Sequence, residues 1–216
     1  MIAGHVTRTI GLEFGAIKVQ LQIVAQLEPY VDVEGLLRDG AAPEPPYWAH
    51  LWAGSRALAR LVATELDCDG RRVAEPGCGV GLSGLVAARK GARVVMFDTA
   101  RDAVRFAAAN AALNACRVDA LQANVERPPL RGKFDYCLAA DLTYDASLQE
   151  AVAAFFAAHL ALHGRAFCAE SVRTHDTRLA VACERHGLQI VERRVREPDD
   201  NRDTEVRISE VTWPRH

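Results

Sequence analysis

From residue 71 onward, short apolar runs alternate with segments long enough to form helices. The runs predict strands near 71–75, 92–98, 117–123, 134–141 and 164–170, with helices near 80–90, 100–114, 146–161 and 174–187. Short, mostly apolar strands that alternate with helices are typical of a parallel sheet covered on both faces. The sequence therefore predicts a Rossmann-like, doubly wound α/β fold.

The C-terminal end departs from this alternation. Residues 188–195 and 205–213 are both strand-like, and the polar turn between them contains Pro198 and has no room for a helix. Two strands joined in this way pair antiparallel. We therefore expect a mostly parallel seven-stranded sheet that ends in an antiparallel hairpin.

The N-terminal segment is strand-like as well. Apolar and polar side chains alternate from Ile17 to Ile23, and Gly15 lies in the turn before them. A proline-rich loop that cannot be helical follows at residues 40–46, and the spacing of apolar residues after it predicts a helix from about Trp48 to Glu65. These features predict a small β-rich extension over residues 1–45 and one larger domain over residues 46–216.

Charge and hydropathy limit the partners of the chain. Its 26 basic and 28 acidic residues give a net charge of −2, and half of its 216 residues are apolar. This balance argues against a constitutive nucleic-acid or anionic-membrane surface. Because Arg8, Glu13 and Lys18 interrupt the N-terminus, we expect neither a signal peptide nor a membrane anchor.

The cysteines and histidines do not suggest a metal site. The six cysteines are scattered without a C-x-x-C pair, which fits a reduced, cytoplasmic compartment. His159 and His163 are spaced for one helix face, but no further ligand is spaced to join them. We expect surface roles for them and for His50.

The strongest functional signal is the turn after the first strand of the repetition, Glu75-Pro76-Gly77-Cys78-Gly79-Val80-Gly81. Glycines there permit positive φ and let the backbone pass close to a ligand. Asp98 ends the next strand, where a carboxylate can accept hydrogen bonds from a ribose diol. The alternative is a plain strand-to-helix turn in which Asp98 caps the next helix.

Glu75 decides which nucleotide ligand fits this turn. The glycines also match the dinucleotide pattern G-x-G-x-x-G, but Glu75 would then oppose a pyrophosphate with like charge. The same carboxylate suits the ammonium or sulfonium group of S-adenosylmethionine. The sequence therefore predicts S-adenosylmethionine as the cofactor.

Asparagines follow in the next helix and strand. Asn110 and Asn114 are spaced i and i+4, hence on one helix face, and Asn114 is placed to cap the helix C-terminus. Asn124 ends the third strand of the repetition, near the expected adenine. Asn124 either bonds the adenine or caps its own loop.

From about residue 45 to its end the chain resembles the class I, seven-β-strand S-adenosylmethionine-dependent methyltransferases. Two segments, Pro46–Ala59 with its Trp48 and Trp52, and Asp141-Leu142-Thr143-Tyr144, resemble those of the protein lysine methyltransferases. The closest likeness is to the branch that methylates the electron transfer flavoprotein β-subunit. Ala53 and Ser55 replace that family's usual Pro and Gly, and Ala169-Glu170-Ser171 replaces the branch's common Gly-Asp-Pro.

The resemblance implies particular roles. Trp52 would help to enclose the cofactor, Ala140 would touch it through its main chain, and Asp141 would lie at the substrate lysine with Tyr144 beside it. The cofactor site would thus comprise Trp52, Glu75, Gly77, Cys78, Gly79, Gly81, Asp98, Asn124 and Ala140.

Strand order supports one site at one edge of the sheet. Ligands of open parallel sheets bind outside the carboxyl ends of the strands. Several acidic or amide side chains fall at such ends, namely Glu75, Asp98, Asn124, Asp141 and Glu170.

We expect methyl transfer to a lysine of a protein; a small-molecule N- or O-methyltransferase and a non-catalytic cofactor-binding module are the alternatives. The sequence leaves the oligomeric state open.

Overall fold

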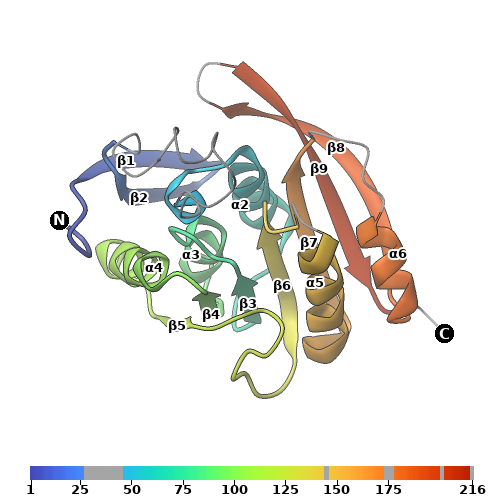
Figure 1. The fold of residues 1–216 in the computed structure, drawn as a ribbon. Coiled ribbons are helices and arrows are strands. Elements are labelled where there is room, and N and C mark those ends of the chain that lie inside the picture. Colours follow the sequence, from blue (N-terminus) through green and yellow to red (C-terminus); the bar gives the residue numbers. More distant parts are fainter. Residues whose placement is uncertain (27–45, 144–145, 173–177, 200–201, 215–216) are drawn as a thin grey trace, which may run out of the picture.

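The computed structural model describes residues 1–26, 46–143, 146–172, 178–199 and 202–214. Seven strands form one sheet in the order β5-β4-β3-β6-β7-β9-β8 (Figure 1). Their bounds are β3 Arg72–Pro76, β4 Arg93–Asp98, β5 Val118–Gln122, β6 Phe134–Ala140, β7 Leu160–Ser171, β8 Gln189–Asp199 and β9 Arg202–Thr212. The strands from β3 to β7 pair in parallel, which confirms the predicted α/β class.

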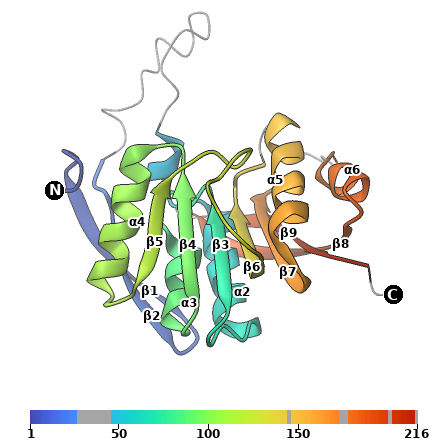
Figure 2. The same ribbon diagram turned by 90° about the horizontal axis from the view of Figure 1, so that it is seen from below.

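Helices cover both faces of the sheet (Figure 2). One face carries α2 (Ala53–Glu65), α3 (Leu82–Arg89) and α4 (Arg101–Leu113), and the other carries α5 (Ala146–His159) and α6 (Arg178–Arg185). Neighbouring residues of one strand therefore enter two different cores. On β3, Val73 packs with α2 and α3, whereas Ala74 packs with α5. This two-sided burial explains why the strands read as continuous apolar runs.

The predicted terminal hairpin is present. Strand β9 pairs antiparallel with both β7 and β8, so it is inserted between them. At the carboxyl end of β7, Ser171 lies opposite Val206. The strand portions of β8 and β9 beyond this point continue to pair with each other, up to Asp199 opposite Arg202.

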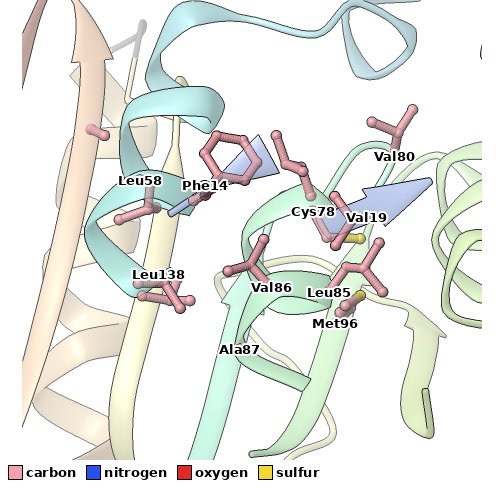
Figure 3. Packing of buried hydrophobic residues seen from close by; sticks show 14 of the residues in the cluster. Phe14, Val19, Leu58, Cys78, Val80, Leu85, Val86, Ala87, Met96 and Leu138 are labelled. Carbon is pink, nitrogen blue, oxygen red and sulfur yellow. The ribbon is translucent and has the colours of Figure 1, made fainter. Parts of the chain in front are cut away.

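The described part of the N-terminal extension contains a second hairpin, made of β1 (Thr7–Phe14) and β2 (Ile17–Val24), whereas the predicted loop at residues 40–46 lies outside the described residues up to residue 45. The hairpin lies on the outer side of the helices α2, α3 and α4, away from the sheet (Figure 1). Its inner side chains, Phe14 and Val19 among them, are buried in the same cluster as Leu58 and Leu85 of the helices (Figure 3). The hairpin thus shares a hydrophobic core with the rest of the chain.

The boundaries of some elements differ from the sequence prediction. The first helix was expected from Trp48, but residues Tyr47–Ala49 form a short 3-10 turn and α2 begins at Ala53. His159 and His163 do not share a helix face, because α5 ends at His159 and β7 already contains His163. Among the described residues no helix is long and apolar enough to cross a membrane.

Candidate functional site

A cavity of about 260 Å³ opens at the carboxyl ends of β3, β4 and β6, as the strand order predicts. The segment before α2 forms its opposite wall, through Tyr47, Trp48, His50 and Trp52. Most of the predicted site residues line it, namely Trp52, Glu75, Gly77, Cys78, Gly79, Asp98, Asn124, Ala140 and Asp141. Residues that are more than 80 positions apart in the sequence therefore meet at one place.

The glycine turn forms the floor of this cavity. Gly77, Gly79 and Gly81 all have positive φ, which the predicted turn requires. A Cβ on Gly79 would come within 2.9 Å of the Trp48 carbonyl oxygen, so the turn and the aromatic wall approach too closely for any side chain. Gly81 lies behind the floor, where it caps the N-terminus of α3.

Glu75 is almost completely buried beneath the turn, with 3% of its surface exposed. Its Oε2 accepts a hydrogen bond of 3.0 Å from the Gly84 N–H in the first turn of α3. Burial raises the pKa of this carboxyl to about 8, although hydrogen bonds from Gly84 and Ser83 act in the opposite direction. A cationic group entering the cavity would favour the ionised carboxylate.

Asp98 joins the glycine turn to the start of α4. Its Oδ2 accepts from the Gly79 N–H at 3.0 Å and its Oδ1 from the Ala100 N–H at 2.9 Å. Burial raises its pKa, and these backbone hydrogen bonds partly offset the rise. Asp98 therefore orders the approach to the helix, as the plain-turn alternative requires, and it also lines the cavity.

Aromatic side chains build the wall opposite the glycine turn. The Trp52 indole N–H donates to the Tyr47 carbonyl at 2.9 Å, and the ring of His50 meets that of Trp52 edge-on with centroids 4.4 Å apart. Trp48 packs on Phe106 of α4 with centroids 5.2 Å apart. Trp48 and His50 thus also line the cavity, although His50 was expected at the surface.

Asp141 lies at the end of β6 in a left-handed conformation with φ of 46°, which is uncommon for a residue other than glycine. Its Oδ1 accepts from the backbone N–H and the hydroxyl of Ser171, at 2.9 and 3.1 Å. A Cβ on Gly54 in α2 would lie 2.2 Å from Asp141 Oδ2, so only glycine leaves room for this carboxylate. Three elements therefore fix the orientation of Asp141.

The remaining predicted residues differ in their surroundings. Asn124 Oδ1 accepts from the Glu126 N–H at 3.0 Å, so the loop-capping role occurs in a residue that also lines the cavity. Glu170 does not join the cavity lining; it forms an ion pair of 2.8 Å with Arg207 instead. Tyr144 lies outside the described residues.

The charged side chains of the cavity lining are acidic. Glu75, Asp98, Glu126 and Asp141 contribute four carboxyl groups, whereas no lysine or arginine lines the cavity within the described ranges. Glu126, His50 and Ser55 were not predicted here. The available sequence signal was that His50 and Ser55 both belong to the tryptophan segment Pro46–Ala59.

Comparisons with known proteins agree with this architecture. Residues 47–140 match the family model of the methyltransferase small domain. No curated protein matches the chain. A solved 16S rRNA N2 methyltransferase from T. thermophilus, in complex with AdoMet and guanosine, superimposes with a TM-score of 0.69 at 17% identity. That match covers 97% of this chain and 51% of the other, so the chain spans about half of that enzyme.

Two further solved structures are similar. A ribosomal protein L11 methylase from Lactobacillus delbrueckii subsp. bulgaricus has a TM-score of 0.60 at 21% identity, over 74% of this chain and 79% of the other. M. jannaschii TYW2 in complex with AdoMet has a TM-score of 0.62 at 12% identity, over 99% and 90%. This chain has the class I methyltransferase fold.

The class I fold confirms the predicted arrangement of strands and helices. With the family match, it supports the prediction of an enzyme that uses S-adenosylmethionine. The acceptors named for the first two structures are an RNA and a ribosomal protein, so these comparisons do not single out a lysine methyltransferase branch.

Proposed function

We propose that this protein is an S-adenosylmethionine-dependent methyltransferase that methylates a lysine side chain of a protein. One observation carries the proposal: the cavity has four carboxyl groups and, in the part of the chain that the structure describes, no basic side chain. Such a cavity attracts cations and repels a polyanionic backbone. Both S-adenosylmethionine and a lysine ammonium present positive charge.

The residues of the cavity fit this cofactor. The glycine turn offers a backbone surface without side chains, Glu75 supplies a carboxyl group for the ammonium, and Asp98 supplies oxygens for ribose hydroxyls. Asn124, Trp52 and the main chain of Ala140 border the remaining space. When bound, the cofactor supplies an electrophilic methyl group on a sulfonium.

The acceptor must present a neutral amine, because its nitrogen lone pair would form the new bond to the methyl group that the sulfonium would release. Asp141, held by Ser171 at the end of β6, attracts the lysine ammonium and orients its nitrogen. Water takes the proton, since an aspartate carboxylate is a far weaker base than a lysine amine. Tyr144 completes the proposed acceptor side.

We propose that residues 1–45 are an extension, whose described hairpin packs on α2, α3 and α4, and that residues 46–216 are the methyltransferase domain. We also propose a reducing, cytoplasmic location, which the six free cysteines support.

The test is incubation of the protein with S-adenosylmethionine labelled in its methyl group and with cell lysate treated or untreated with nuclease. We expect nuclease-resistant label on protein that amino-acid analysis assigns to methylated lysine. Label on RNA or on a small molecule would refute the lysine acceptor while leaving the methyltransferase activity intact. Absence of any labelled product, together with normal cofactor binding, would favour the non-catalytic module.

A further inference from the structure

Asn110 of α4 and Asn114, which caps the C-terminus of α4 as predicted, pair with the backbone of the N-terminal hairpin. Asn110 accepts from the Gln22 N–H at 2.7 Å and donates to the Gln22 carbonyl at 3.1 Å. Asn114 repeats both contacts on Gln20, at 2.8 and 2.6 Å. The two amide side chains thus complete the edge of β2 as a neighbouring strand would.

The spacing of the two elements explains this pairing. Four residues of an α-helix rise about 6.0 Å, and two residues of a strand rise about 6.7 Å. Side chains at i and i+4 on α4 can therefore reach backbone groups at i and i+2 on β2. The backbone N–H and carbonyl groups of Gln20 and Gln22 that point away from β1 thereby obtain hydrogen-bond partners.

Asn110 differs from Asn114 in one contact. Its Nδ2 also donates to the Val80 carbonyl at 2.9 Å, within the glycine turn that forms the cavity floor. Asn110 is fully buried, and Val80 belongs to the same buried cluster as Val19 of β2 (Figure 3). Asn114 makes its third hydrogen bond to the Asn110 carbonyl and none to residues 77–81 among the described contacts.

We propose that Asn110 is a positioning residue for the cofactor turn, and that it couples the N-terminal hairpin to cofactor binding. The proposal rests on the proposed function, because it treats the glycine turn as the cofactor site. One amide holds the turn and the hairpin in a single geometry before the ligand arrives. A turn without this bond must be ordered during binding, and that ordering weakens the affinity.

The experiment compares Asn110→Ala with the matched control Asn114→Ala in the full chain. Both variants remove the paired contacts to β2, but only the first releases Val80. S-adenosylhomocysteine affinity is measured by calorimetry, and stability without ligand by urea unfolding. We expect about tenfold weaker binding for Asn110→Ala, because one lost neutral hydrogen bond changes an equilibrium by about this factor. Asn114→Ala should stay within about twofold of the parent.

The outcomes separate the possible failures. Equal affinity of Asn110→Ala and the parent would overturn the positioning role, and so would an equal loss in Asn114→Ala. If Asn110→Ala does not fold, Asn110→Leu takes its place with Asn114→Leu as its control, since leucine keeps the side-chain volume and loses the donor to Val80. Absence of S-adenosylhomocysteine binding by the parent would refute the proposed function, and the role of Asn110 with it.

Discussion

Glu75 makes the stability of this protein depend on pH in a way that one substitution should remove. The carboxyl group is buried beneath the glycine turn, and its pKa is raised from 4.5 to about 8. Glu75→Gln keeps the shape and an oxygen that can accept from the Gly84 N–H. It removes the titration.

The sign follows from the order of the two pKa values. Below 4.5 the carboxyl is protonated in both states; between 4.5 and about 8 the unfolded chain releases a proton that the folded chain keeps. Stability is therefore lost as the pH rises through this window. At 1.36 kcal/mol for each pKa unit, the full effect has an upper limit of about 5 kcal/mol. About 4 kcal/mol of it falls between roughly pH 5 and pH 9.

Urea unfolding at several pH values measures this effect. The free energy of unfolding of the parent should fall by about 4 kcal/mol more than that of Glu75→Gln between roughly pH 5 and pH 9. Glu126→Gln is the matched control, because it removes an exposed carboxylate from the same cavity and should follow the parent. Parallel curves for the parent and Glu75→Gln would refute the buried, protonated Glu75.

The pH dependence of ligand binding gives a second test of the ionisation of Glu75. The ammonium of S-adenosylhomocysteine should favour the ionised carboxylate, so its affinity for the parent should rise between about pH 6 and pH 8. The affinity of Glu75→Gln should change little over this range. A rise of equal size in both proteins would mean that another group responds to the ligand.

Three further predictions concern the site and the core. Asp98→Ala should weaken S-adenosylhomocysteine binding by roughly 1.5–3 kcal/mol for each charge-assisted hydrogen bond lost. Asp141→Asn should bind this ligand nearly normally and lose most methyl transfer. Full turnover in Asp141→Asn would exclude the acceptor role. Ser171→Ala removes one donor to Asp141, so turnover should fall about three- to tenfold at unchanged cofactor affinity, with partial rescue by Ser171→Thr. Lys90→Met should lower the free energy of unfolding by about 1.5–3 kcal/mol in urea titrations, because Lys90 Nζ donates to three carbonyls at the end of α2.

Local pattern was enough for the elements of this fold because each signal is contained in a few neighbouring residues. The alternation around Val19 and Leu21 predicted the second strand of the N-terminal hairpin, and these side chains are buried. The polar turn after residue 195 predicted the terminal hairpin in the same way. The position of Asp98 at a strand end predicted that it lies at the cavity, where the structure places it; its hydrogen bond of 3.0 Å from the Gly79 N–H was not predicted.

The limits of the elements were set by packing that no local pattern contains. Helix α2 begins five residues later than expected, at Ala53, because the preceding segment folds against the glycine turn and Trp48 packs on Phe106. His50, expected at the surface, is drawn into the cavity wall by the same packing.

The sequence by itself determined the strand–helix alternation, the glycine turn and the carboxylates at the strand ends, since all of these depend on local periodicity and residue chemistry. Only the tertiary structure decided which groups share a hydrogen bond. In the tertiary structure Asp141 accepts hydrogen bonds from Ser171, and Glu170 forms an ion pair with Arg207 instead of lining the cavity. Asn110 donates hydrogen bonds to the carbonyls of both Gln22 and Val80. The physical reason is that a hydrogen bond depends on ångström-scale approach between elements far apart in the chain, and that approach is fixed by the packing of two cores on the sheet.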